Sequence, residues 1–415
     1  MKSDYRVAVE VLVIGAGPAG SVAAALLCQQ GRQVLVLERE QFPRFSIGES
    51  LLPQSMEYLE QAGMLRTVQE SGFQLKNGAV FTRGQQLTEF DFSDKYSAGW
   101  CTTHQVERAR FDQLLALEAE RQGAAVCHGH EIVAVDVSGP RPRATVKDSS
   151  GSRGEYTVEA GFILDASGFG RVLPRLLQLE TPSKFPVRAS IFTHVEDGIG
   201  PSEFDRNKIR IAVHPANPAV WYWLIPFANG RSSIGVVAEA TFLARYAGSQ
   251  TERLQALIGE DPLLRHLLRD SRWDTPARQI IGYSANVKAL YGRNFALLGN
   301  AGEFLDPIFS SGVTIAFKSA SLAANVLHRQ FAGETVDWQD EFAAPLKRGI
   351  DTFRAFVESW YRGGFQRIIF HADPPRKVRR MISAILAGYA WDETNPYVRD
   401  TERRLAALEE LCYER

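Results

Sequence analysis

Cysteine, net charge and long apolar runs are all scarce in this sequence. Its four cysteines among 415 residues are scattered without metal-ligand spacing, and 47 basic residues nearly balance 48 acidic ones. This balance removes the electrostatic case for nucleic acid as a main partner. Apolar stretches such as VAAALL at 22–27 are too short to cross a bilayer, and MKSDYRVAVE at 1–10 has no signal-peptide pattern. We therefore expect a soluble protein of the reducing cytoplasm, with no membrane span.

Several catalytic and metal-binding patterns are also missing. His128 and His130 have no third ligand beside them, so we assign no metal site. Ser50, in the triplet GES, is not a nucleophile elbow because G-x-S-x-G is absent. A chain of 415 residues exceeds one ordinary core, so we expect two lobes or one domain with a large insertion.

A glycine-rich turn, GAGPAG at 15–20, is the clearest local motif. It lies between a β-branched run and a small-residue helix, and a second strand follows that helix. Gly15 permits the tight turn, Gly17 lets a pyrophosphate approach the backbone, and Gly20 lets helix and strand pack closely. Glu38 ends the second strand, where a carboxylate accepts hydrogen bonds from ribose hydroxyls. The motif favours a dinucleotide site, for FAD or NAD, over a plain βαβ turn.

Later segments indicate how such a cofactor is held. Arg108 comes early in a predicted helix at 105–123, where a cation can meet phosphate. A strand runs into a glycine turn at 162–171, and 294–327 reads as a strand, a glycine- and serine-rich loop and a long helix. One extended cofactor gripped at several points explains these turns. A separate nicotinamide domain is not expected, because no second G-x-G-x-x-G is present.

The remaining segments predict a second sheet and a helical end. Strand character dominates 76–103 and 185–240, and Asn229-Gly230 marks a hairpin. After about residue 336 the pattern is helical.

Together these motifs carry a family resemblance. The glycine turn, FPRFSIGESLLP at 42–53, DASGFGR at 165–171, the segment 294–327 and above all W-x-W-x-I-P at 221–226 resemble the flavin-dependent halogenases. These belong to a wider class that is similar to p-hydroxybenzoate hydroxylase. The likeness is greatest to halogenase-like flavoproteins of aryl polyene and flexirubin-type pigment pathways, and it runs nearly end to end.

The resemblance implies an α/β fold with a Rossmann-like FAD-binding domain, an inserted antiparallel substrate sheet and C-terminal helices. It divides the chain into an FAD-binding domain (1–75, 104–180 and 275–335), a substrate-side sheet domain (76–103 and 181–274) and a helical region (336–415). The residues it implies for FAD are Gly15, Gly17, Pro18, Ala19, Gly20, Glu38, Arg39, Arg44, Ser50, Arg108, Asp165, Gly168, Asn300, Pro307 and Gly312.

The chemistry that the resemblance implies begins with FADH2 from a separate reductase. Oxygen gives a flavin C4a-hydroperoxide, and chloride or bromide attacks it to form hypohalous acid. This oxidant passes a wall that keeps the aromatic substrate from the flavin, and it reaches a lysine. The F-x-x-P-x-x-S-x-G motif, which ends at Gly312, implies a halide on the amides of Ser311 and Gly312. The alternative is a loop that only cradles the flavin ring.

Trp221 and Trp223 are the expected wall. Alternate strand residues point to one face, so the two indoles stand side by side, Ile225 continues the row, and Pro226 ends regular pairing. An aromatic core row is the alternative interpretation. The complete motif beside the others favours the wall.

Lys76, in FQLKNGAVF, is the expected catalytic lysine. As an ammonium it donates hydrogen bonds to the oxidant, and as a desolvated amine it can form a chloramine. The competing interpretation is an exposed residue at a hairpin turn, because Asn77-Gly78 follows it.

Two departures from the family pattern narrow the substrate. Asn300 replaces a common aspartate, which keeps a hydrogen bond but removes a charge near the flavin. Phe309 stands where tryptophan halogenases have glutamate, so a phenol, a pyrrole or an aryl polyene head group is expected instead of free tryptophan. A carrier-bound substrate stays open: the basic residues 376–380 can meet an acidic carrier or form a solvated helix face.

Three hypotheses follow from the sequence. The first is an FADH2-dependent halogenase, or halogenase-like enzyme, that acts on an electron-rich aromatic. The second is an FAD-dependent monooxygenase or dehydrogenase of a pigment pathway that uses no halide. The third is a flavin-binding protein that assembles with pathway partners.

Overall fold

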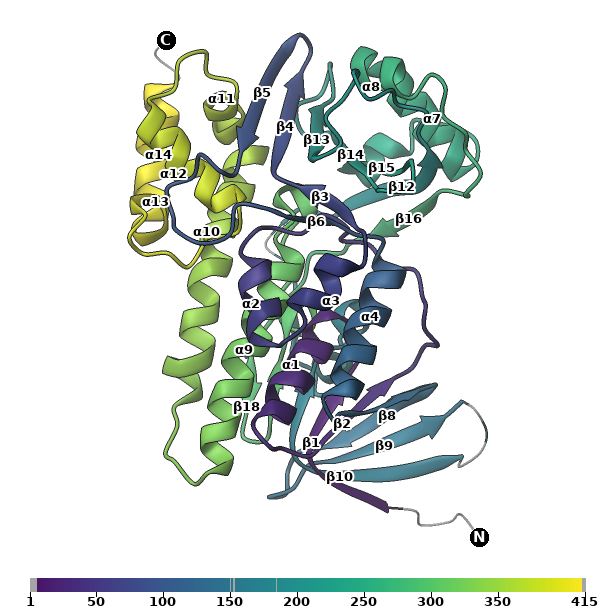
Figure 1. Cartoon of the computed structure of the whole chain (residues 1–415), viewed down its shortest axis with the longest axis vertical. Coiled ribbons are helices and arrows are strands. Elements are labelled where there is room, and N and C mark those ends of the chain that lie inside the picture. The colour runs from purple at the N-terminus through teal and green to yellow at the C-terminus, as the bar shows by residue number, and fades with distance from the viewer. Residues whose placement is uncertain (1–5, 150, 152–153, 184, 413–415) are drawn as a thin grey trace.

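The computed structural model describes residues 6–149, 151, 154–183 and 185–412. Two large sheets lie in different parts of the molecule, and helices of the C-terminal region pack beside them (Figure 1). The first sheet has eight strands in the order β18-β19-β10-β1-β2-β7, with β9 on β10 and β8 on β9. Its strands are β1 (Arg6–Ile14), β2 (Val34–Glu38), β7 (Ala125–His128), β8 (His130–Asp136), β9 (Arg143–Asp148), β10 (Glu155–Asp165), β18 (Tyr291–Gly292) and β19 (Phe295–Leu297).

The centre of this sheet is parallel and buried on both faces. β1 pairs in parallel with β10 and β2, and β10 pairs in parallel with β19. Val11 and Val13 face the largest apolar core, whereas Leu12 and Ile14 face a second one on the other side. A β-branched run covered on both faces is what a central parallel strand requires.

Helices supply the core on the first face of the sheet. The helices of the chain are α1 (Pro18–Gln29), α2 (Ser55–Gln61), α3 (Leu65–Glu70), α4 (Arg108–Arg121), α5 (Val172–Leu176), α6 (Ala240–Leu243), α7 (Gln250–Glu260), α8 (Pro262–Leu267), α9 (Gly312–Phe331), α10 (Ala344–Tyr361), α11 (Gly364–Ile369), α12 (Arg376–Leu386), α13 (Pro396–Arg399) and α14 (Thr401–Leu411). Among the described residues, no helix combines the length and apolarity needed to cross a membrane.

The second sheet has seven strands in the order β16-β12-β15-β14-β13-β4-β5. Its strands are β4 (Gly78–Arg83), β5 (Gln86–Asp91), β12 (Arg188–Glu196), β13 (Lys208–Val213), β14 (Trp221–Pro226), β15 (Arg231–Glu239) and β16 (Arg278–Ile281). All pairs are antiparallel except β4 with β13. The predicted hairpin at Asn229-Gly230 joins β14 to β15, and Gly230 has the positive φ of 78° that such turns favour. The predicted fold class is confirmed.

The competing interpretation of Asn77-Gly78 as a hairpin turn is wrong. β3 (Gln74–Lys76) ends before Asn77 and pairs with β6 (Thr103–Gln105), whereas β4 begins at Gly78 and pairs with β5 and β13. Asn77 instead lies where the chain passes from the small two-stranded sheet of β3 and β6 into the seven-stranded second sheet. A β-carbon on Gly78 would lie 2.1 Å from the Phe90 carbonyl oxygen, so close backbone approach explains this glycine.

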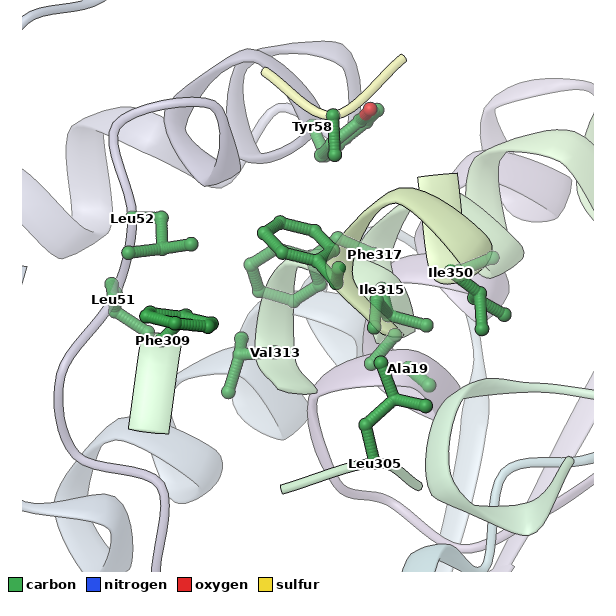
Figure 2. Close-up of a cluster of buried hydrophobic side chains, with 14 of the residues drawn as sticks. Ala19, Leu51, Leu52, Tyr58, Leu305, Phe309, Val313, Ile315, Phe317 and Ile350 are labelled. Atoms are coloured by element: carbon green, nitrogen blue, oxygen red, sulfur yellow. The ribbon is translucent and has the colours of Figure 1, made fainter. Parts of the chain in front are cut away.

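The C-terminal helices close the core between the two sheets. Figure 2 shows Ile350 of α10 and Phe317 of α9 in one apolar cluster with Leu51, Leu52 and Phe309. Most of these side chains are fully buried. The C-terminal region is therefore part of the same core as the glycine turn.

Candidate functional site

A cavity of about 340 Å³ lies between the two sheets. Glycine turns of the first sheet form one side, and β12, β13 and β14 form the other. The predicted site residues that line it are Gly15, Gly17, Pro18, Ala19, Glu38, Arg39, Arg44, Ser50, Arg108, Gly168, Trp221, Trp223, Asn300, Pro307 and Gly312. Gly20, Lys76, Asp165 and Ser311 lie outside this lining.

Three turns converge because they follow the carboxyl ends of adjacent parallel strands, β1, β10 and β19. The Ala166 amide donates to the Ile14 carbonyl at 2.9 Å, and the Leu298 amide donates to the Asp165 carbonyl at 2.8 Å. Gly15 has a φ of 94°, and a β-carbon there would lie 2.8 Å from the Ala166 carbonyl oxygen. The first turn therefore tolerates only glycine at this position.

Glu38 is buried at the end of β2 and faces this turn. Its Oε2 accepts from the Ala16 amide at 3.0 Å, and its Oε1 accepts from the Glu40 amide at 3.0 Å. A carboxylate has about four acceptor positions, so lone pairs remain for hydroxyl donors in the cavity.

Two cations share one buried carboxylate beside the cavity. Arg108 Nε and Nη2 donate to Asp112 at 2.7 and 2.9 Å, and Arg44 Nη1 donates to the same carboxylate at 3.0 Å. Two guanidinium groups against one carboxylate leave a net positive charge, which suits phosphate. Asp112 was not predicted from the sequence. Its spacing of four residues from Arg108 on a helix was the available signal.

Asp165 accepts hydrogen bonds from backbone amides of its own turn and does not line the cavity. Its Oδ1 accepts from the Ser167 amide at 2.9 Å and its Oδ2 from the Leu173 amide at 2.7 Å. Burial raises the pKa of this carboxyl, although the amide bonds oppose the rise. Its predicted contact with the cofactor stays a prediction.

The N-terminus of α9 has the backbone conformation of an anion nest. Ser310 is left-handed, with φ 57° and ψ 24°, and Ser311 is right-handed, with φ −74° and ψ −18°. Successive residues of opposite hand turn their amides toward one point. Neither the Ser311 nor the Gly312 amide donates to another residue in the part of the chain that the structure describes. This is the geometry expected of the predicted halide site, which stays a prediction.

Trp221 and Trp223 stand side by side in the cavity wall. Their ring centroids are 6.0 Å apart with an interplanar angle of 48°. Both face the large core with Ile225, whereas Tyr222 points to the opposite face. The Trp223 indole lies over Gly235, where a β-carbon would come within 2.3 Å of its ring. The predicted side-by-side arrangement is present, and Gly235 is what makes room for it.

Lys76 is buried, with 1% of its surface exposed, so the interpretation as an exposed turn residue is wrong. Its Nζ donates to Ser50 Oγ at 2.7 Å and to the Leu51 carbonyl at 2.9 Å. Burial lowers the pKa of Lys76 to about 7, so both protonation states exist near neutrality. Ser50 also lines the large cavity and thus connects the amine to it.

The space around Lys76 is small. The cavity beside it has a volume of about 10 Å³ and is closed by Phe81, Phe92, Phe309 and Leu386, among others. Such a volume holds at most one water, since a cavity needs roughly 10–15 Å³ for one. Ile209, Ile211 and Ser310 line both cavities and therefore separate them.

The basic residues 376–380 largely fasten α12 to the chain. Arg376 and Arg380 approach Asp94 at 3.6 and 3.1 Å, and Arg379 donates to the Glu89 carbonyl. Within the described ranges, no three histidine, cysteine, aspartate or glutamate side chains are placed to hold a metal ion.

The sequence matches one family model, that of an FAD binding domain, over residues 8–285. The chain belongs to this FAD-binding family. The match spans the glycine turn, Glu38, Arg108 and the whole of the second sheet.

Relatives extend this family likeness to the halogenases. A tryptophan 2-halogenase of Chondromyces crocatus is 32% identical over 78% of this chain, which spans 62% of that enzyme. A 1H-pyrrole-2-carbonyl-[peptidyl-carrier protein] chlorinase of Pseudomonas fluorescens is 27% identical over 97% of this chain and 94% of its own. A solved flavoprotein/dehydrogenase of Cytophaga hutchinsonii is 42% identical, with a TM-score of 0.94 over 98% of this chain and 99% of its own. The protein is an FAD-dependent oxidoreductase related to flavin-dependent halogenases.

The residues present fit FAD. Gly15 and Gly20 allow a turn that any β-carbon would obstruct, and free carboxylate lone pairs of Glu38 suit a ribose. Arg44 and Arg108 would meet the pyrophosphate at the start of α1, where helix amides also point. Pro307 and Gly312 would border the flavin ring.

Replacing Asp112 with asparagine should destabilise the apoprotein by about 3 kcal/mol, because the buried Arg108 guanidinium and the partly buried Arg44 guanidinium lose their charged partner. FAD phosphates should restore part of the loss, since a ligand that binds the folded state stabilises it. Chemical denaturation with and without FAD measures both effects. The matched control is Glu70→Gln on α3, whose exposed pair with Arg66 should contribute less than about 1 kcal/mol. Equal effects of the two variants would contradict the assignment.

Proposed function

We propose that the protein is an FADH2-dependent halogenase acting on an electron-rich aromatic such as a phenol, a pyrrole or an aryl polyene head group. One observation carries this proposal: a buried amine, Lys76, is linked through Ser50 to the wall of the FAD cavity. No carboxylate of the described residues pairs with this amine, and burial lowers its pKa to about 7, which suits transfer of an electrophilic halogen.

The chain's own residues would divide the work. Bound reduced FAD supplies the oxidising chemistry with oxygen. The Ser311 and Gly312 amides hold a halide, and Trp221 and Trp223 keep an aromatic ring from the flavin. Lys76 as ammonium orients hypohalous acid, or as amine takes its halogen and releases water. The aromatic carbon then gains the halogen and loses a proton.

A relative and the sequence support further features of the proposed reaction. The chlorinase relative acts on a pyrrole that a carrier protein holds, which supports a carrier-bound substrate here as one form. The single G-x-G-x-x-G turn supports reduction by a separate flavin reductase. A cytoplasmic location is proposed because both the reductase and reduced thiols belong there.

A second function is favoured by the closed space beside Lys76. A cavity of about 10 Å³ has no room for an aromatic ring, so halogenation there requires Phe309 or Leu386 to move. Without such movement the substrate would meet the flavin in the large cavity. The protein would then be a monooxygenase or a dehydrogenase that uses no halide, and the 42% identical flavoprotein/dehydrogenase supports this candidate.

Product analysis distinguishes the two functions. The protein is incubated with FAD, a flavin reductase, NADH, oxygen and bromide or chloride, and monochlorodimedone or a phenol is the acceptor. We expect a halogenated product that depends on the halide. A hydroxylated or dehydrogenated product, unchanged when halide is omitted, would establish the second function and overturn the first.

A further inference from the structure

Trp221 is held by a hydrogen-bonded chain that leaves its own sheet. Its indole Nε1 donates to the Tyr361 hydroxyl at 2.9 Å, and that hydroxyl donates to Asp306 Oδ2 at 2.8 Å. Tyr361 is the last residue of α10, and Asp306 precedes the loop that leads into α9. The chain therefore joins the second sheet, the C-terminal helices and the loop beside the flavin site.

Asp306 is buried, with 3% of its surface exposed, and both of its carboxylate oxygens accept hydrogen bonds. Its Oδ1 accepts from the Ile308 amide at 3.1 Å, and Tyr283 donates to Oδ2 at 3.4 Å. The Arg188 guanidinium lies 3.4 Å above the Tyr361 ring. The Asp306 carboxylate holds the Tyr361 hydroxyl and the Arg188 guanidinium covers the Tyr361 ring, so two groups fix the orientation of this side chain.

The two indoles of the wall have different anchors. Trp223 Nε1 donates to Ser233 Oγ at 3.0 Å, and Ser233 is on β15, the neighbouring strand of the same sheet. Trp221 depends instead on Tyr361 of α10. An indole N–H is a donor only, so rotation of Trp221 away from Tyr361 leaves a buried donor unpaired.

We propose that Tyr361 and Asp306 are positioning residues that set the orientation of the Trp221 indole, and that the protonation of Asp306 changes the hold on this half of the wall. The proposal is independent of whether the protein halogenates, because either function uses the same cavity wall. Neither residue lines the cavity itself; each contacts a side chain that does. Tyr283 does line the cavity and gives Asp306 its link to a bound molecule.

The titration of Asp306 lies in an accessible pH range. Burial raises the pKa of Asp306 to about 6, and the groups that face it are Tyr361 from α10, Tyr283 from the segment after β16, Arg188 from β12 and the Ile308 amide. Above this pH the carboxylate is a charged acceptor for Tyr361. Below it the charge is lost and the bond weakens, because charge-assisted hydrogen bonds are roughly twice as strong as neutral ones.

Indole N–H resonances of the FAD-loaded protein, labelled with 15N-tryptophan, test this proposal. Loss of the Trp221 signal in Trp221→Phe identifies it among the seven tryptophans. In the unaltered protein, its chemical shift should change with a midpoint near pH 6, whereas the Trp223 shift should not. In Tyr361→Phe, the Trp221 signal should move to a weakly bonded position and lose at least about three-quarters of its pH response.

Asp306→Asn keeps the side-chain shape, so it provides a second test of the proposal if Tyr361→Phe does not fold. It should leave the Trp221 signal near its place but remove the pH response. Tyr389→Phe is the matched control, because Tyr389 is a buried tyrosine of the same region that donates to the Trp100 carbonyl. It should leave the Trp221 titration intact. An unchanged titration in both Tyr361→Phe and Asp306→Asn would overturn the proposal.

Discussion

Replacing Lys76 with methionine should reduce halogenated product by at least about 100-fold while reduced FAD is still reoxidised by oxygen. The reason is that the amine is the only proposed carrier of the electrophilic halogen, and two to three orders of magnitude are typical for loss of one positioned catalytic donor. Product chromatography and flavin absorbance measure the two quantities separately. Full product formation by the variant would remove Lys76 from the mechanism.

The same substitution should also change how the unfolding free energy depends on pH. Burial lowers the pKa of Lys76 to about 7, whereas an unfolded lysine titrates near 10.4. Between these two pH values the unfolded chain carries one more proton than the folded protein, so the unfolding free energy of the unaltered protein rises with pH. Below about pH 7 the folded protein also carries the charged lysine, and the unfolding free energy no longer changes with this titration. Relative to Lys76→Met, the protein should gain roughly 2–3 kcal/mol between pH 7 and 9. Denaturant unfolding at the two pH values measures this difference.

Lys208→Met is the control for both measurements. Lys208 is also buried, in β13 of the second sheet, but it pairs with Glu89 at 3.2 Å and Asp205 at 2.7 Å. Burial lowers its pKa, but these two bonds outweigh burial, so the pKa is raised. Its loss should therefore leave halogenation intact and give no rise in relative stability from pH 7 to 9. A matching pH response in the two variants would show that the low pKa does not belong to Lys76.

The local parts of the site follow from the sequence. The glycine turn, Glu38 and the row of Trp221, Trp223 and Ile225 are set by short-range rules: a tight turn, a strand end and a two-residue repeat. Each of these rules connects residues that lie close in the chain, so the sequence contains all the information that they need.

The contacts made at long range do not follow from it. Asp306 and Tyr361 are 55 positions apart, and Tyr361 is 140 positions from Trp221. Nothing in the spacing of these residues indicates that they meet. The competing interpretation of Asn77-Gly78 as a hairpin turn failed for a similar reason: β4 pairs with β5 and with β13, about 130 residues away, and this pairing overrides the local turn preference.

Closure of the Lys76 space is also a long-range feature. Leu386 reaches it from α12, whose other side is fastened by Arg376 and Arg380 to Asp94. These ion pairs are exposed and each contributes little, so α12 is held mainly by its apolar face. Movement of Leu386 with this helix, or of Phe309, would admit an aromatic substrate to the amine, and its absence would favour the function without halide.

Replacing Gly20 with alanine should release FAD and destabilise the fold. A β-carbon there would lie 1.9 Å from the Gly15 carbonyl oxygen, which belongs to the backbone of the turn and cannot turn aside as a flexible side chain can. Relief requires α1 to move away from β1. We expect a loss of about 3 kcal/mol in unfolding free energy, at the upper end for one inserted methyl group, and FAD binding about 100-fold weaker. Flavin fluorescence on titration measures the affinity.

Gly259→Ala is the same change in another helix and should act in the opposite direction. Gly259 lies in α7, and among the residues that the structure describes, no atom outside its local backbone is within 4 Å of the added carbon. Alanine is a better helix former than glycine by about 0.5–1 kcal/mol, so this variant should be slightly more stable and bind FAD normally. The sign difference between two identical substitutions isolates close approach in the turn from helix propensity. Normal FAD binding by Gly20→Ala would show that close packing of α1 on β1 does not require glycine at this position.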